Sequence, residues 1–146
     1  MEKPQEITKQ FIAVRAVIVK DDKVLGIRES STYEAGTNHG KYDFPGGKVK
    51  VGESVHDALT RELMEEVGAE VKIGTPFFVD EWRTIIKGEF VQIIGIFFEC
   101  ELITENIALG EDHDDAKWIG RDEYESIPLI VENRHAIEAY FALKNK

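Results

Sequence analysis

Three glutamates lie close together in one short segment of the chain. Glu62 precedes Glu65 and Glu66 by three and four residues, steps that bring side chains onto one face of an α-helix. Like charges at this spacing repel each other, so the cluster costs stability unless something compensates for it. A hard cation such as Mg²⁺ would compensate, because it prefers carboxylate oxygens and keeps several water ligands. The alternative is a solvated, charge-rich helix face, which is the usual explanation for glutamates on a helix.

The residues that flank this cluster favour the metal-binding interpretation. A glycine, a glutamate and an Arg-Glu pair are separated by gaps of five and seven residues, and the complete set is Gly47, Glu53, Arg61, Glu62, Leu63, Glu65, Glu66 and Gly68. This spacing resembles the Nudix box, the signature of the Nudix hydrolase family. One position departs from the pattern: Ala69 stands where the family has Ile, Leu or Val, which affects packing after the helix rather than the chemistry.

The resemblance implies a reaction and a fold. Nudix hydrolases cleave a nucleoside diphosphate linked to another group, X. Their fold is an α/β (α+β) arrangement, an α/β/α sandwich with a mixed β-sheet and a loop–helix–loop catalytic motif. The expected cofactor is Mg²⁺, with Mn²⁺ as a substitute, which would polarise the diphosphate oxygens and lower the pKa of a bound water. The sequence offers no GxxxxGK[ST] phosphate loop and no Gly-x-Ser-x-Gly elbow that would support a competing mechanism.

The glutamates of the box take the central roles in this chemistry. Glu65 and Glu66 are the expected metal ligands, and Glu62 is either a third ligand or the general base. By resemblance to the family, a carbonyl around Gly46 or Gly47 adds a further ligand.

Two other charged residues of the box are assigned supporting roles. Glu53 precedes the helix, where it would join the metal shell through water or simply interact favourably with the helix dipole. Arg61 lies one helical turn before Glu65, so we expect an orienting ion pair between these two side chains rather than a contact with substrate.

Family members often recruit a further acid from a loop outside the box. The acidic segment at 110–115 is the place where we expect it, with Glu111 as the first choice ahead of Asp112 and His113. A solvated acidic loop explains any one of these residues equally well.

Aromatic residues and one histidine are candidates for substrate contacts. Phe77, Phe78 and Trp82 could stack on a base, and Trp82 is the best of the three because Glu81 and Arg83 flank it, whereas core packing explains the two phenylalanines equally well. His39, in a long polar loop, could touch phosphate, although a lone histidine is more often a surface residue.

Composition limits the remaining possibilities. The net charge of −10 argues against binding a nucleic-acid polymer, and it means that an anionic ligand must meet local cations or a metal. The single cysteine, Cys100, excludes an internal disulfide framework, fits a reducing compartment and is expected to be a small buried apolar residue. The polar N-terminus and the shortness of the apolar run at 93–98 predict a soluble, cytoplasmic protein with no membrane partner.

Hydrophobic periodicity and turn residues predict one domain over residues 1–146. The expected strands are 11–20, 24–28, 71–83 in one or two pieces, 90–103 and 117–119, with turns at 21–22 and 87–89. Loops are expected at 29–42 and 104–116. Helices are expected at 55–67, with Ser54 as N-cap and Gly68 as the stop signal, at 121–126 and at 131–143. The loop at 29–42 is long enough to face substrate or to contribute to an interface, and a homodimer is left open.

Three functions are compatible with these features. ADP-ribose and diadenosine polyphosphate hydrolases of the family carry a proline or a tyrosine about sixteen residues after the box, where this chain has Ile85 and Ile86. The absence of both markers favours a MutT-like nucleoside triphosphate pyrophosphohydrolase acting on a small nucleotide. A hydrolase of nucleotide sugars or other diphosphate conjugates is the first alternative. A non-catalytic ligand sensor is the second, and the intact set of glutamates argues against it.

Overall fold

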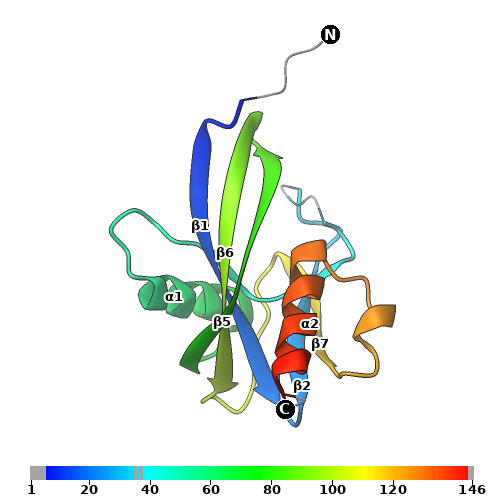
Figure 1. The fold of residues 1–146 in the computed structure, drawn as a ribbon. Helices are drawn as coiled ribbons and strands as arrows, with labels where there is room; N and C mark the ends of the chain where they lie inside the picture. Colours follow the sequence, from blue (N-terminus) through cyan, green and yellow to red (C-terminus); the bar gives the residue numbers. More distant parts are fainter. Residues whose placement is uncertain (1–5, 35, 37, 145–146) are drawn as a thin grey trace.

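The computed structural model describes residues 6–34, 36 and 38–144, and its centre is a seven-stranded mixed β-sheet between two α-helices (Figure 1). The strands are β1 (Lys9–Lys20), β2 (Lys23–Glu29), β3 (Tyr42–Asp43), β4 (Gly46–Lys48), β5 (Val71–Ile86), β6 (Glu89–Leu102) and β7 (His113–Ile119). The helices are α1 (Val55–Val67) and α2 (Val131–Lys144), with a 3₁₀ helix η1 at Tyr124–Ser126. This arrangement confirms the predicted mixed α/β sandwich.

Strand β1 organises the sheet, whose main order is β3-β2-β1-β6-β5. It runs parallel to β6 from the pair Lys9↔Val91 to the pair Ile18↔Cys100. Its other edge first pairs with β4, where Arg15 lies opposite Gly46, and then with β2 through the hairpin at Asp21 and Asp22. The two glycines before the helix are therefore held against the middle of a central strand.

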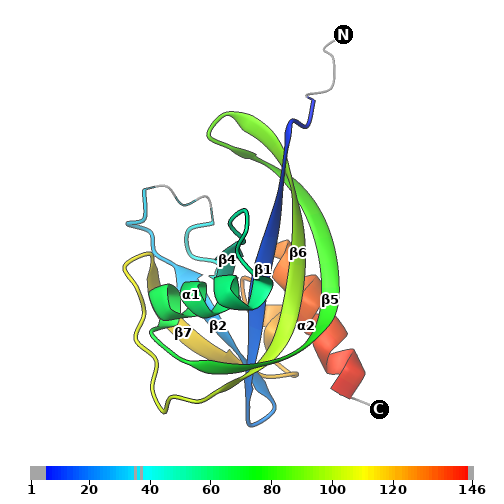
Figure 2. The same ribbon diagram turned by 90° about the vertical axis from the view of Figure 1, so that its left-hand side faces the viewer.

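The two helices cover opposite faces of the sheet (Figure 2). One apolar cluster joins α1 to side chains such as Val14 and Phe98, and the other joins α2 to Phe44 and Phe97. Arg15 lies on β1 between Val14 and Ala16 of the first cluster, so its half-buried side chain projects from the opposite face, the face that carries α2. The sheet thus places a charged side chain beside β3 and β4, close to Asp43 and Gly46.

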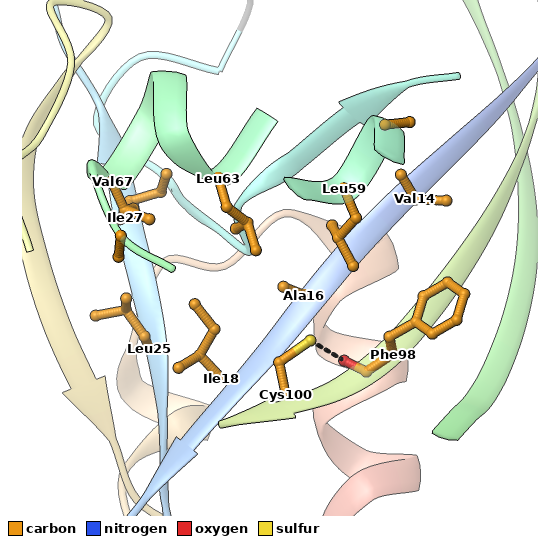
Figure 3. Packing of buried hydrophobic residues seen from close by; sticks show 12 residues of the cluster. Val14, Ala16, Ile18, Leu25, Ile27, Leu59, Leu63, Val67, Phe98 and Cys100 are labelled. Carbon is orange, nitrogen blue, oxygen red and sulfur yellow. Dashed lines mark hydrogen bonds between the residues drawn. The ribbon is translucent and has the colours of Figure 1, made fainter. Parts of the chain in front are cut away.

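Helix α1 has the predicted ends and the predicted apolar stripe. The Ser54 hydroxyl accepts a hydrogen bond from the Asp57 N–H at 3.0 Å, and Gly68 adopts a left-handed conformation that ends the helix. Leu59, Leu63 and Val67 are completely buried and point from α1 onto β1 and β2 (Figure 3). Each such burial contributes about 1.5–3 kcal/mol, so the stripe holds the helix, and the glutamates on it, firmly against the sheet.

Several element boundaries differ from the predictions. β7 begins at His113, so the prediction of loop up to residue 116 was wrong; pairing with β2 extends the strand despite its acidic sequence. β5 is a single strand, one of the two predicted options, with register shifts on either side of Pro76, and it ends at Ile86 rather than at Arg83. The helix expected at 121–126 is reduced to η1, and the short strands β3 and β4 inside the loop region were not predicted.

Cys100 is buried, as expected, and burial raises the pKa of its thiol to about 12. Among the described residues, no helix is long and apolar enough to cross a membrane.

Candidate functional site

The two glycines at the start of the box allow three segments of chain to approach one another closely. A Cβ atom at Gly46 would lie 2.0 Å from the backbone oxygen of Val14, and the φ of Gly46 is +153°. A Cβ atom at Gly47 would lie 2.4 Å from Cδ of Glu62. Any other residue at these positions would push β4 away from β1 or displace the Glu62 carboxylate from the loop, so the glycines set the position of the Glu62 carboxylate.

Arg61 lies at the centre of the charged network of the box. Its guanidinium donates to both oxygens of Glu53, at 2.9 and 3.0 Å, and to Oε1 of Glu62 at 2.8 Å. The predicted ion pair with Glu65 is present but longer, at 3.8 Å. Hydrogen bonds from Arg61 and from the Lys50 N–H lower the pKa of Glu53 to about 2. Arg61 therefore positions Glu53 and Glu62 more directly than Glu65.

Glu66 has the most perturbed carboxylate of the site. It accepts a hydrogen bond from the Gly46 N–H at 3.2 Å. Burial raises the pKa of Glu66 to about 8, with further contributions from nearby Asp43 and Glu62, while Arg15 and the Gly46 N–H act in the opposite direction. Glu65 is different because its side chain is 60% exposed. The helix face thus presents two partly buried carboxylates, Glu62 and Glu66, and one exposed carboxylate, Glu65, at the boundary between core and solvent.

The raised pKa of Glu66 predicts how the stability of the metal-free protein depends on pH. Between pH 4.5 and about 8 the folded state holds a proton that the unfolded chain has released. Raising the pH through this range therefore lowers the free energy of unfolding, by up to about 1.4 kcal/mol per pH unit from this group. Urea unfolding in EDTA at several pH values, compared between wild type and Glu66→Gln, isolates the contribution, because glutamine does not titrate. Parallel curves for the two proteins would contradict the prediction.

The carboxylates of α1 fit a hard divalent cation in chemical type. All the donors are oxygens, and placing a cation beside them would offset both the burial of Glu66 and its repulsion by Glu62. Within the part of the chain that the structure describes, no three His, Cys, Asp or Glu side chains already converge as a metal cage. The guanidinium of Arg61 holds Glu53 and Glu62 instead. The residues fit a metal, which would compete with Arg61 for the oxygens of Glu62.

Two cavities open beside the box, on the same face of the sheet as α2. The smaller measures about 410 Å³ and is bounded by Gly47 and Lys48 of the box; the larger measures about 760 Å³ and reaches the loop after β2 and the start of α2. Arg15 and Trp82 line both. The cations around the smaller cavity are Lys9, Arg15, Lys48 and Lys87, against one acid, Glu89.

Trp82 forms a wall between these cavities. A Cβ atom at Gly95 would lie 2.6 Å from the indole ring, so the ring lies directly against the sheet at this glycine. Trp82 therefore lines both cavities, and its role as a substrate contact stays a prediction. Phe77 packs on Tyr140 and Phe78 on Phe97, so these two phenylalanines belong to the packing beneath α2.

Arg15 lines both cavities, although the sequence analysis did not select it as a candidate. Its Nη1 donates to Asp43 and to the Phe44 carbonyl, each at 3.2 Å. Burial opposes its charge, but Asp43, Glu66 and Glu62 outweigh that effect and raise the pKa of Arg15. The available signal was a single charge within an otherwise apolar strand, which is costly unless the charge has partners or a ligand.

The acidic segment before β7 is brought to the C-terminal end of α1. The Gly110 N–H donates to the Glu66 carbonyl at 2.9 Å, and a Cβ atom at Gly110 would lie 2.6 Å from the Glu65 carbonyl. Glu111 follows at once and is exposed. His113 turns inward: its Nδ1 is buried without a hydrogen-bond partner among the described residues, and burial lowers the pKa of its ring.

His39 is not brought to either cavity among the described residues. Its Nε2 lies 2.6 Å from the Tyr33 carbonyl and 3.7 Å from Glu29, within its own loop. Asn38 and Lys41 of the same loop line the larger cavity instead.

Comparison with known proteins agrees with this geometry. Residues 9–140 match the family model of the NUDIX domain. The nucleoside triphosphatase NudI of Salmonella arizonae is 30% identical over 105 residues, which cover 67% of this chain and 74% of that protein. A MutT NUDIX hydrolase from Burkholderia pseudomallei superposes with a TM-score of 0.77 at 25% identity, over 90% of this chain and 98% of the other. The MutT protein from Methanosarcina mazei Go1 gives a TM-score of 0.78 at 25% identity, over 94% and 97%.

Proposed function

Because the chain belongs to the Nudix hydrolase family, we propose that it is a Mg²⁺-dependent pyrophosphohydrolase of free nucleoside triphosphates. The products would be a nucleoside monophosphate and pyrophosphate. The nearest functional support comes from the relative named a nucleoside triphosphatase, at 30% identity.

One observation carries this proposal: the cavity next to the box is cationic, although the whole chain has a net charge of −10. Long-range electrostatics alone would repel a polyphosphate from such a protein. The cations that line the smaller cavity attract a polyphosphate instead, and they lie beside Gly47 and Lys48 of the box. The same cavity offers apolar and aromatic walls, among them Phe11, Ile93 and Trp82, which suit a nucleobase.

The residues of the site divide the substrate between them. Trp82 stacks on the base, since an indole face tolerates any base and contributes binding energy. Arg15 lies between the cavities and the carboxylates of α1, and its guanidinium donates to the phosphate nearest the ribose. Arg61 donates to Oε1 of Glu62 and so holds this carboxylate next to the reacting phosphates.

Glu62, Glu65 and Glu66 would hold the divalent cation, with a carbonyl of Gly46 or Gly47 as a further donor and Glu53 reaching it through water. A bound Mg²⁺ supplies charge stabilisation for the departing phosphate and lowers the pKa of a coordinated water. Glu62 is a ligand or accepts the proton of that water, and Glu111 is a second candidate for the proton acceptor. His39 is a candidate for an outer phosphate contact.

A substrate panel tests the proposal. Nucleoside triphosphates, nucleotide sugars and dinucleotides are incubated with the protein and Mg²⁺, and the products are separated. Pyrophosphate together with a nucleoside monophosphate is expected from one or more triphosphates. Sugar phosphates would favour the alternative, a nucleotide-sugar hydrolase, for which the larger cavity of about 760 Å³, with both polar and apolar walls, has room. No Mg²⁺-dependent product from any substrate would favour a non-catalytic sensor.

Replacing Trp82 with alanine tests the stacking role. We expect KM to rise by about 10-fold or more, because base–aromatic stacking contributes about 1–3 kcal/mol, while kcat changes little. Trp82→Phe, which keeps an aromatic face, should recover most of the affinity. Equal KM values for the alanine variant and wild type would exclude a stacking contact.

A further inference from the structure

β5 is an edge strand, and its two halves differ in how the free edge is protected. The first half is irregular, because the pairing with β6 shifts register on either side of Pro76. From Phe78 to Ile86 the pairing with β6 is regular over nine consecutive residues. Proline and bulges are devices that protect a free edge from pairing with another chain. The second half has neither a proline nor a bulge. The N–H of Glu81 in this half donates to the Asp80 carboxylate at 2.8 Å, and pairing with another strand would have to replace this one bond.

The side chains of this second half alternate between two environments. Those facing α2 have partners: Phe78 packs on Phe97, and the carboxylate of Asp80 lies 3.0 Å from Nδ1 of His135. Those on the opposite face are exposed, with Val79 and Ile85 at 62% and 57%. Between these two lie Glu81 and Arg83, whose side chains are each 53% exposed; one oxygen of Glu81 accepts a hydrogen bond from Nε2 of Gln92 on β6. This exposed row, Val79, Glu81, Arg83 and Ile85, is therefore apolar, negative, positive and apolar in order.

This row is complementary to itself when it is reversed. If a second copy of β5 runs antiparallel to the first about Trp82, then Val79 lies opposite Ile85 of the other copy. Glu81 likewise lies opposite Arg83, twice by symmetry. Directly opposed apolar pairs and opposite charges each stabilise an antiparallel strand pair. Within one copy the Glu81 and Arg83 groups are 3.9 Å apart, a distant contact between exposed side chains.

We propose that the free edge of β5 between Val79 and Ile85 pairs with the same segment of a second copy of this chain. The pairing is antiparallel, with a two-fold axis at Trp82, and it joins two sheets into one continuous sheet. A charged edge usually prevents such pairing, but here each charge meets its opposite. Because a two-fold contact occupies this free edge in both copies, no third copy can pair with the same segment.

The contact also reaches the substrate site. Arg83, Thr84 and Ile85 line the larger cavity, so the second copy would lie along the rim of that cavity. The interface is short, and contacts of small area are weak and transient. We expect a dissociation constant of about 1–100 μM. The proposal concerns association alone and does not depend on the reaction.

A charge exchange within one chain tests the proposal. Sedimentation velocity of the full chain, from about 1 μM to about 1 mM, should show a reversible monomer–dimer equilibrium. Glu81→Arg or Arg83→Glu alone brings like charges into opposition and should weaken association about 10-fold or more. The double variant Glu81→Arg/Arg83→Glu restores both pairs and should return to within about threefold of wild type.

Matched controls separate this contact from a general effect of charge. Glu138→Arg on α2 and Lys72→Glu in the protected half of β5 change the net charge equally at other exposed positions, and neither should alter association. A protein that stays monomeric throughout the range would overturn the proposal. So would a dimer that the single exchanges do not weaken, or that the double exchange does not restore.

Discussion

Glu66→Gln is expected to lower kcat/KM for the best nucleoside triphosphate by about 10²–10³-fold, the cost of removing one preorganised charged group from a site of this kind. Glu66 lies partly buried on the face of α1, burial raises its pKa, and the Gly46 N–H donates to one of its oxygens. Glutamine keeps the shape of the side chain but cannot provide the negative charge that a divalent cation needs. Steady-state kinetics at saturating Mg²⁺ measures the loss.

The same substitution should leave the fold intact and raise the stability of the metal-free protein above pH 8, because it removes a buried charge. Loss of activity together with retained or increased stability separates a functional role from a structural one. Glu70→Gln, just beyond the helix and exposed, is the matched control and should behave like wild type. Near-normal turnover by Glu66→Gln at saturating Mg²⁺ would remove Glu66 from the metal-binding set.

Arg15→Gln is expected to reduce kcat/KM by about 10–100-fold, the range for losing a hydrogen bond to a charged group. Nη1 of Arg15 donates hydrogen bonds to Asp43 and to the Phe44 carbonyl. Arg15 also lines both cavities, where its guanidinium can donate to a ligand. Lysine keeps the charge but loses the planar fork, so Arg15→Lys should show a smaller reduction.

Calorimetry distinguishes a phosphate contact from a structural role of Arg15. If the guanidinium binds phosphate, Arg15→Gln weakens binding of the nucleoside monophosphate and leaves binding of the nucleoside unchanged. Arg28→Gln is a suitable control, because Arg28 forms a comparable ion pair with Asp114 on the surface, at 2.7 Å. Equal losses for nucleoside and nucleoside monophosphate would mean that Arg15 acts by holding Asp43 and β3 in place.

Helix α1 shows how much of the site local sequence can specify. Its ends depend on Ser54 and Gly68, which act through hydrogen bonds and backbone conformation within a few residues. Its buried stripe follows from the four-residue repeat of Leu59, Leu63 and Val67. Because these interactions are short-range, the range 55–67 could be predicted correctly, together with the relative positions of its glutamates.

Predictions that depended on distant partners were less successful. β7 begins at His113 because β2 pairs with an acidic segment of low strand propensity. Arg61 prefers Glu53 to Glu65 because the loop before the helix folds back onto it, which the helical spacing alone does not reveal. His39 was a candidate only by residue type, and its described contacts lie within its own loop.

The spacing of Gly47, Glu53 and Glu62–Gly68 was therefore sufficient to identify the family and the face of the catalytic helix. The tertiary structure alone decided how exposed each of those glutamates is, which cations surround the neighbouring cavity, and that Arg15 lines it. The reason is physical: helix periodicity and capping act over a few residues, whereas burial, pKa and cavity shape arise where β1, β4, β5 and α1 meet, and those strands and helix are far apart in the sequence.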